Sequence, residues 1–367
     1  MKIEFSGKER GVELVKALSL AIGPSGFEDE VRSMIYTAIA DLGADISVDK
    51  MGNLCALYHG SAPDGERKKL MISAHMDEVG FIINDIDKEG YLRLSAIGGI
   101  DDRVIPGKKV TFVGTDGTHY NGIIATKAIH HKKRDERDQV TPLERMYADI
   151  GAKDKEDAET RLALGDAGTF DSEFCLFGEN DAFVKSKALD DRMGCAAMIE
   201  IMRKIKEQGI TFENDVLFAF TVREETGLSG AGVLAHRYTP DYSIVIECTA
   251  VADLPDVAAH KRIAALGNGG AVSIADRSTI YQKDMVDLAM NTAGNSGIKA
   301  QLKKYISGGN DAGHIHKSGV GVSVIAVSVP TRYLHSAACV AAWSDYEAVR
   351  DLVGKLTDVI GKKKEGK

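Results

Sequence analysis

Leu-Met-Ile-Ser-Ala-His-Met-Asp-Glu, residues 70–78, is the segment that decides the fold of this 367-residue chain. Its first five residues form a short apolar run, which is typical of a buried strand. The polar residues that follow begin with His75. In an open α/β sheet, ligands bind beyond the carboxyl ends of the strands. The segment therefore predicts both a sheet strand and a functional edge, and the character of the sequence changes directly after Glu78.

Strand-like and helix-like segments alternate on both sides of residues 79–171. Apolar residues at helical spacing precede a stop at Gly23–Pro24. Capping-box patterns at Ser25 to Glu28 and at Ser344 to Glu347 predict two further helix starts. The main predicted elements are helices that run towards Leu42, over 191–208 and over 346–360, and strands at 216–222, 242–246 and 322–329.

The interrupting segment has the texture of a β domain. Short alternating runs at 81–86, 91–97, 109–113 and 120–125 are broken by glycines, with a hairpin turn at Thr115-Asp116-Gly117. A short helix is expected from Asp154 to Leu164. The prediction is an α/β domain made of residues 1–76 and 172–367, interrupted by a β-rich insert at residues 77–171.

Composition excludes several classes of protein. The net charge of −8 and the absence of a basic stripe argue against nucleic-acid binding. No apolar run reaches the ~18 residues that a membrane span needs. Met1 to Arg10 alternates charged and apolar residues, unlike a secretory signal. The odd number of cysteines, without CxxC spacing, favours a reducing compartment, so a cytoplasmic protein is expected.

Candidate metal ligands are distributed along the chain in a way that one shared site would require. Most of them come at or soon after a predicted strand, and one precedes the helix over 191–208. The set is His75, Asp190, Glu225, Glu247 and His335. Two histidines and three carboxylates suit a pair of divalent metals with open positions for water. A metal-assisted hydrolase is therefore the first hypothesis.

Each ligand has a plainer interpretation when it is taken alone. Asp190–Asp191 could cap a helix, Glu224–Glu225 could be a solvated pair, and His335 could pair with Tyr333. Glu247 is harder to explain in this way, because it lies between apolar neighbours and a buried charge needs a partner or a metal. Only the five residues taken together point to a metal site.

As a set, the motifs resemble those of the M42 metallo-aminopeptidases. This is the tetrahedral or glutamyl aminopeptidase type, also labelled endoglucanase M, and the resemblance spans roughly residues 10 to 360, including the inserted β domain. The matching segments are Ala-His-Met-Asp-Glu (74–78), Ala-Leu-Asp-Asp-Arg (188–192), Glu-Glu-Thr-Gly (224–227), Glu-Cys-Thr-Ala-Val-Ala-Asp-Leu-Pro (247–255), Gly-Gly-Asn-Asp-Ala (308–312) and Pro-Thr-Arg-Tyr-Leu-His-Ser (330–336). The resemblance implies a zinc-peptidase-like mixed-sheet catalytic domain with helices on both faces, interrupted by a β-barrel-like domain.

The resemblance also implies how the ligands divide between two divalent ions, with zinc or cobalt expected. His75 and Glu247 would bind one ion, Glu225 and His335 the other, and Asp190 would bridge them. Many relatives carry Asp where this chain has Glu247; glutamate reaches one methylene further and is still a hard oxygen ligand.

Two further residues receive roles. By resemblance, Glu224 would be the general base and Asp77 would orient His75. Adjacent glutamates can divide ligation and proton transfer only if the backbone after Val222 is irregular, because successive side chains of a regular strand point to opposite faces. The Thr-Gly-Leu-Ser-Gly segment that follows permits this.

The function expected is a dinuclear metal-dependent aminopeptidase that removes N-terminal residues from short peptides in the cytoplasm. The resemblance implies that the insert joins two chains, and that dimers assemble into a dodecamer. A lid formed by the insert is the alternative use of that segment. Two other functions are a glycosidase, which would need a pair of carboxylates but no metal, and a peptide-binding module that adds a strand to the insert. Both leave the histidines at 75 and 335 unexplained.

Overall fold

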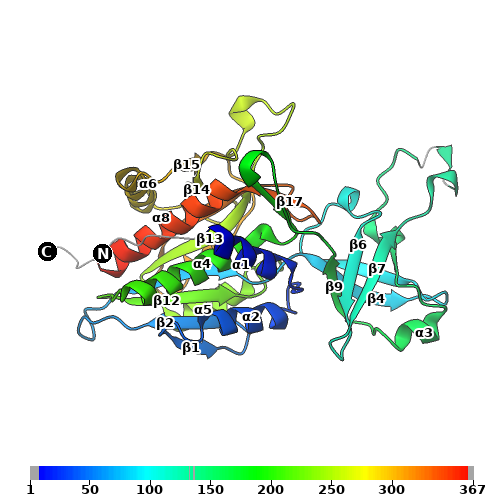
Figure 1. Cartoon of the computed structure of the whole chain (residues 1–367), viewed down its shortest axis with the longest axis horizontal. Coiled ribbons are helices and arrows are strands. Elements are labelled where there is room, and N and C mark those ends of the chain that lie inside the picture. The colour runs from blue at the N-terminus through cyan, green and yellow to red at the C-terminus, as the bar shows by residue number, and fades with distance from the viewer. Residues whose placement is uncertain (1–7, 132, 135–136, 363–367) are drawn as a thin grey trace.

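The structure is a computed structural model that describes residues 8–131, 133–134 and 137–362. Two bodies lie side by side in it (Figure 1). The larger one is an α/β sandwich with the long helix α8 (Trp343–Gly361) across its sheet, and the smaller one is a β-barrel. Among the described residues, no helix is long and apolar enough to cross a membrane.

The larger body is built on an 11-stranded mixed sheet. Its strands are β1 (Asp45–Val48), β2 (Leu54–Tyr58), β3 (Lys69–His75), β10 (Cys175–Phe177), β11 (Phe183–Ser186), β12 (Asp215–Thr221), β13 (Tyr242–Ala250), β14 (Gly270–Ser273), β15 (Ala300–Lys303), β16 (Ser323–Arg332) and β17 (Cys339–Ala342). The order is β1-β2-β12-β3-β13-β16-β17-β11-β10, with β14 paired to β16 and β15 to β14. The central strands β12, β3, β13 and β16 run parallel, so their carboxyl ends share one edge.

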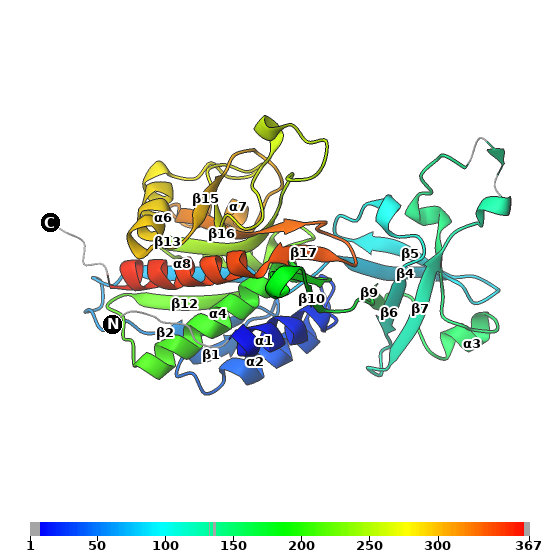
Figure 2. The same ribbon diagram turned by 45° about the horizontal axis from the view of Figure 1, so that its top comes forward.

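Helices cover both faces of this sheet. They are α1 (Lys8–Leu20), α2 (Asp29–Ile39), α4 (Leu189–Gln208), α5 (Ser229–Tyr238), α6 (Lys283–Ser296), α7 (Ala312–Ile315) and α8. One face carries α1, α2, α4, α6 and α8, and the other carries α5 and α7 (Figures 1 and 2). Single 3₁₀ turns lie in the connections at Asp102–Val104, Ile129–His131, Leu143–Arg145, Glu179–Asp181 and Ala259–Lys261.

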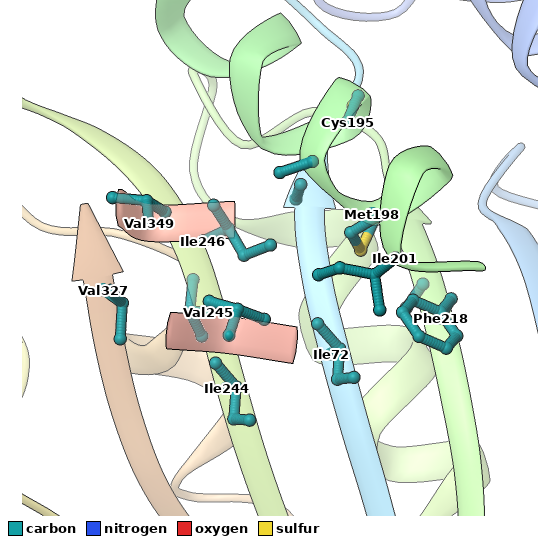
Figure 3. Packing of buried hydrophobic residues seen from close by; sticks show 14 of the residues in the cluster. Ile72, Cys195, Met198, Ile201, Phe218, Ile244, Val245, Ile246, Val327 and Val349 are labelled. Carbon is teal, nitrogen blue, oxygen red and sulfur yellow. The ribbon is translucent and has the colours of Figure 1, made fainter. Parts of the chain in front are cut away.

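The packing of α4 fixes one ligand-bearing segment against another. Met198 and Ile201 of α4 lie against Ile72 of β3 and Phe218 of β12 (Figure 3), and Cys195, nearer the start of α4, donates to the His75 carbonyl oxygen at 3.2 Å. All five are fully buried. Complete burial of a large apolar side chain contributes about 1.5–3 kcal/mol relative to exposure. The start of α4 is thereby held over the carboxyl end of β3.

The smaller body is a closed six-stranded barrel with its own core. Its strands are β4 (Gly80–Ile86), β5 (Leu92–Ile97), β6 (Lys109–Val113), β7 (His119–Ala125), β8 (Tyr147–Asp149) and β9 (Ala167–Phe170), in the order β4-β5-β8-β7-β6-β9. Phe81, Phe112 and Phe170 are buried within it. The predicted fold class, a mixed-sheet α/β domain interrupted by a barrel, is confirmed.

Both predicted capping boxes are wrong. α2 begins after Glu28, whose side chain makes no cap bond, and the Ser25 hydroxyl donates instead to Asp77 Oδ2 at 2.5 Å. A hydrogen bond to a carboxylate is stronger than one between neutral groups, which favours this contact over a bond from a helix amide to the serine oxygen. α8 begins at Trp343, one residue before Ser344. The Trp343 indole Nε1 donates to Glu347 Oε1 at 3.1 Å, so Glu347 bonds a side chain and not a backbone amide of the cap.

The predicted helix from Asp154 to Leu164 is shorter than expected. α3 spans only Lys155–Glu159, capped by the Asp154 side chain, which accepts from the Asp157 amide. The strands and helices between residues 270 and 303 had no individual prediction. These short elements gain their stability from packing on β16 and α8 rather than from a strong local pattern.

Candidate metal centre

The crevice at the sheet edge opens where two parallel strands separate. β3 and β13 pair from Leu70 and Tyr242 as far as Ser73 and Val245, and no further. His75, the last residue of β3, and Glu247 both lie beyond that point. Glu247 does not end its strand, as the sequence suggested, because β13 continues in register with β16 to Ala250. A ligand on a continuous strand has little freedom to move.

Asp190 reaches the crevice because the first turn of α4 is irregular. Ala188 has a left-handed backbone (φ 48°), and Asp190 and Asp191 have non-helical angles. The helix-capping role falls to the neighbouring residue: Asp191 Oδ1 accepts from the Gly194 amide at 3.0 Å. The Asp190 carboxylate is left to face the two histidines. Non-glycine residues in left-handed conformations are strained and gather at functional sites.

The two oxygens of Asp190 face different histidines. Oδ1 is 3.3 Å from His75 Nε2, and Oδ2 is 3.7 Å from His335 Nε2. Glu247 Oε2 is 3.8 Å from His75 Nε2, and Glu225 Oε1 is 3.2 Å from His335 Nε2. In each of the triads His75–Asp190–Glu247 and Asp190–Glu225–His335, the ligand atoms lie within 4.8 Å of one another. All five sequence-predicted ligands are therefore brought together, with Asp190 between two positions.

The histidines and carboxylates of the site stabilise one another's charged forms. Burial would raise the pKa of Asp190, but hydrogen bonds from His335 and His75 lower it well below its usual range. Burial would lower the pKa of His335, but its contacts with Asp190 and Glu225 raise it to about 11. A cation that enters this site replaces a proton in neutralising the same carboxylates.

Both histidines are oriented through their second ring nitrogen. His75 Nδ1 donates to the Asp77 carbonyl oxygen at 3.1 Å, and His335 Nδ1 donates to the Gly99 carbonyl oxygen at 2.7 Å. A carbonyl oxygen only accepts, so Nδ1 carries the proton and Nε2 can ligate. Gly99 lies on the barrel side, between β5 and β6, so the barrel helps to orient a candidate ligand of the other body.

Asp77, which the sequence predicts to orient His75, also contacts the segment that carries Glu224 and Glu225. Besides approaching His75 Nδ1 at 3.5 Å, its two carboxylate oxygens accept from the amides of Glu224 and Glu225 at 3.0 Å each. The backbone after Val222 is irregular, with Arg223 in a left-handed conformation (φ 57°). Asp77 therefore holds the turn that carries both glutamates.

Glu224 belongs to a separate group with His75 and Glu225, whose ligand atoms also lie within 4.8 Å. Burial raises the pKa of Glu224, opposed by His75 and assisted by the neighbouring Glu225 and Asp311 carboxylates. Asp311 belongs to the Gly-Gly-Asn-Asp-Ala segment, to which the sequence assigns no role. It is fully buried behind the site, accepts from the Thr221 hydroxyl at 2.7 Å, and has a pKa raised by burial to about 6.

The donor set fits hard or borderline divalent cations. Glu247 Oε1 and Asp191 Oδ2 are buried without a hydrogen-bond partner in the part of the chain that the structure describes. A buried carboxylate oxygen without a partner is costly unless a cation supplies one. Cys248 lies near Asp190 and Asp191, but burial raises the pKa of its thiol, which donates to the Leu189 carbonyl oxygen instead.

Comparison with known families decides the identity of this arrangement. Residues 52–352 match the family model of the M42 glutamyl aminopeptidases. The chain belongs to this family. The M42 chain is 35% identical to a putative aminopeptidase of Acetivibrio thermocellus, over 93% of this chain and 97% of that one. It is therefore a peptide hydrolase, a metallo-aminopeptidase, and the predicted family is confirmed.

Solved structures agree with this assignment. The TET aminopeptidase of the marine sediment archaeon Thaumarchaeota archaeon SCGC AB-539-E09 shares 34% identity, covers 96% of each chain and superposes with a TM-score of 0.91. The TET1 peptidase of Pyrococcus horikoshii shares 33% identity, with 94% of this chain and 98% of that chain covered and a TM-score of 0.82. That peptidase can assemble into a tetrahedron or a large octahedral shell. Membership of a peptidase family argues against the glycosidase and peptide-binding alternatives.

Proposed function

We propose that this M42 chain is a dinuclear metal-dependent aminopeptidase that acts on short peptides with a free N-terminus. The observation that carries the proposal is Asp190, whose two oxygens face two separate histidines at 3.3 and 3.7 Å. His75 and Glu247 hold the first ion in this proposal, Glu225 and His335 hold the second, and Asp190 bridges them. Zinc or cobalt is the expected metal, since both take this mixture of nitrogen and oxygen ligands.

Two ions bound in this way polarise a carbonyl group and lower the pKa of a nearby water. The remaining chemistry belongs to the side chains. Glu224 accepts a proton from the attacking water and returns it to the leaving amine, a role that fits a carboxylate whose pKa burial raises. Asp77 keeps this base and the ligand Glu225 in fixed relation, because it accepts from both main-chain amides.

The assembly and the place of action are also proposals. We infer that residues 77–171 form a dimerisation domain, that residues 1–76 with 172–367 form the catalytic domain, and that dimers build a hollow tetrahedral dodecamer. Support comes from the shell-forming TET1 relative and from the closed, separately packed barrel. A cytoplasmic location is consistent with five free cysteines; cell fractionation would test it.

Metal analysis of purified variants tests the proposed site. Asp190→Asn should lose far more metal than His335→Ala, because the first change weakens both positions and the second only one. The wild-type chain should contain two ions and should hydrolyse aminoacyl chromogenic substrates until a chelator is added. Near-complete metal retention in Asp190→Asn would show that this residue does not bridge.

The same preparation tests the substrate class. Peptides with a free amine should be shortened one residue at a time, while N-acetylated copies of the same peptides should be left intact. Mass spectrometry of the digest separates the outcomes. Internal cleavage of a blocked peptide would instead point to an endopeptidase, and release of the acetyl group would point to a deacylase.

A further inference from the structure

Glu78, which follows the orienting residue Asp77, is a buried carboxylate in which every oxygen is occupied. Only 3% of it is exposed. Oε1 accepts from Lys187 Nζ at 2.7 Å, from the Gly23 amide at 3.2 Å and from Arg192 Nη2 at 3.3 Å. Oε2 accepts from Thr169 Oγ1 at 2.7 Å and from Lys187 Nζ at 2.9 Å. This set, called the Glu78 cluster below, touches no ligand atom of the candidate metal centre in any recorded hydrogen bond.

The Glu78 cluster joins the two segments that carry His75 and Asp190. Lys187 and Arg192 stand on either side of Asp190 in the sequence, and Glu78 stands three residues after His75. Arg192 is fully buried and also donates to the Met76 carbonyl oxygen at 2.7 Å, directly after His75. One carboxylate and one guanidinium therefore hold the irregular start of α4 against the end of β3.

The cluster also reaches the barrel. Thr169 lies on β9, 1% exposed, and its hydroxyl donates to Glu78. The Glu78 backbone is clamped as well, because its amide donates to the Gly23 carbonyl oxygen at 3.0 Å and its carbonyl oxygen accepts from the Ser25 amide at 3.1 Å. β4, the first barrel strand, begins two residues later at Gly80. Glu78 is therefore one of the links between the two bodies, alongside the hydrogen bond from His335 to Gly99.

Burial makes the cluster sensitive to small changes. Lys187 is 3% exposed and Arg192 is not exposed at all, so neither cation can turn to solvent if its anion is lost. Removing one partner of a buried ion pair leaves an uncompensated charge that the fold must accommodate by moving. The irregular backbone at Ala188 and Asp190 lies between these two cations in the sequence. Movement there displaces the proposed bridging ligand.

We propose that Glu78 is a positioning residue of the metal centre: it sets the separation of His75 from Asp190, and it aligns the barrel with them. The inference rests on the proposed dinuclear function, since it assigns a role toward that centre. Groups that orient metal ligands from outside the ligand set typically change metal affinity by about 10- to 100-fold when they are altered.

Two substitutions separate charge from position. Glu78→Gln keeps the reach of the side chain and removes its charge, whereas Glu78→Asp keeps the charge and shortens the reach by one methylene. Zinc affinity is measured on the metal-free proteins by competition with a chromophoric chelator, and folding is checked by circular dichroism. Positioning predicts that both variants bind zinc at least about tenfold more weakly than wild type. Wild-type affinity in Glu78→Asp would overturn the inference, because then only charge would matter.

A matched control distinguishes positioning from general loss of stability. Glu200 accepts from Tyr346 at 2.6 Å and from Arg350 at 3.3 Å between α4 and α8, away from the ligands. Glu200→Asp and Glu200→Gln should lower the melting temperature of the metal-free protein while leaving zinc affinity within about twofold. Equal losses of zinc affinity in the Glu78 and Glu200 variants would overturn the inference.

A milder change keeps the test decisive if the Glu78 variants do not fold. Thr169→Val removes one hydrogen bond from Oε2 with little change of shape, and should weaken zinc binding severalfold without unfolding the chain. Unchanged affinity in that variant would then count against the inference. If wild-type protein bound neither zinc nor cobalt, the proposed function itself would fail, which is a different result from equal binding by wild type and variants.

Discussion

Glu224 and Glu225 are neighbours in sequence but lie in different groups of the candidate metal centre, and the proposed function gives them different tasks. Glu225 Oε1 lies 3.2 Å from His335 Nε2, whereas Glu224 groups with His75. Glu224→Gln should retain both metals and lower kcat by about 10²-fold or more, because only proton transfer is removed. Glu225→Gln should lose metal first. Metal analysis and steady-state kinetics of both variants check this; a Glu224→Gln enzyme near the wild-type rate would move the base elsewhere.

Protons should compete with metal at His335. In the metal-free protein its pKa is raised to about 11, so the imidazole is charged at neutral pH and a metal must displace a proton from it. Metal affinity should therefore rise with pH, by roughly tenfold per pH unit for each displaced proton. Titration calorimetry in buffers of different ionisation enthalpy counts the protons released. His335→Ala should release about one fewer; equal release in both proteins would contradict the assignment.

The raised pKa of His335 also makes the stability of the metal-free protein depend on pH. The folded pKa of His335 exceeds the ordinary histidine value of 6.5, so its contacts stabilise the metal-free fold fully below that pH. The contribution is lost as the pH rises through about 11. Metal-loaded protein should not follow this dependence through His335, because the bound ion replaces the proton.

At the scale of elements, the turn between β12 and α5 decides where both glutamates lie. The Asn53 side chain joins its two ends, accepting from the Val222 amide at 3.1 Å and donating to the Gly230 carbonyl oxygen at 3.0 Å. A Cβ at Gly230 would stand 2.2 Å from Val222 O and 2.5 Å from Asn53 Oδ1. Backbone atoms cannot yield at that distance, so the turn must open.

Gly230→Ala should therefore lower the free energy of unfolding by about 1–3 kcal/mol and reduce metal retention, since Glu225 moves with the turn. Gly294→Ala is the matched control. It lies in α6 with nothing within 4 Å of an added Cβ, and should stabilise the chain by about 0.5–1 kcal/mol. Urea unfolding and metal analysis check both. Intact metal content in a destabilised Gly230→Ala would show that the turn does not position Glu225.

At the scale of the whole molecule, the barrel can be separated from the catalytic body. Its chain enters and leaves side by side, because Phe81 pairs with Gly168. The two bodies have distinct cores. Replacing residues 82–167 by a short Gly-Ser linker should leave a folded α/β body that no longer dimerises, while the full chain should scatter light as a particle many times 39.5 kDa.

Loss of the barrel should also remove the size filter. If active sites face the interior of a hollow shell, the intact assembly should refuse folded proteins, whereas the barrel-less body has no shell to exclude them. That body also lacks Gly99, whose carbonyl oxygen orients His335, so its metal content must be measured alongside its activity. A full-length chain that is a monodisperse, fully active monomer at micromolar concentration would contradict the assembly.

Patterns within the sequence were enough to predict the kind of fold and the candidate ligand set. Apolar runs and helical or alternating periodicity depend only on residues near one another, so buried strands such as residues 70–74 and the helix after Asp190 could be predicted. Parallel strands share a carboxyl edge, so the order of strands and polar residues in the sequence predicts that His75, Glu225 and His335 lie close together. Local patterns failed where another partner competed, as when Ser25 bonded to Asp77 instead of capping a helix.

Only the tertiary structure decided which atoms face one another. The separation of β3 and β13, the left-handed Ala188 and the irregular turn after Val222 set the distances between ligands. Asp311 and Glu78 escaped assignment because their partners, Thr221 in one case and Thr169 in the other, lie far away in the chain. A contact between distant residues depends on how whole elements pack, and packing follows from the summed burial of the core, which no short segment of sequence contains.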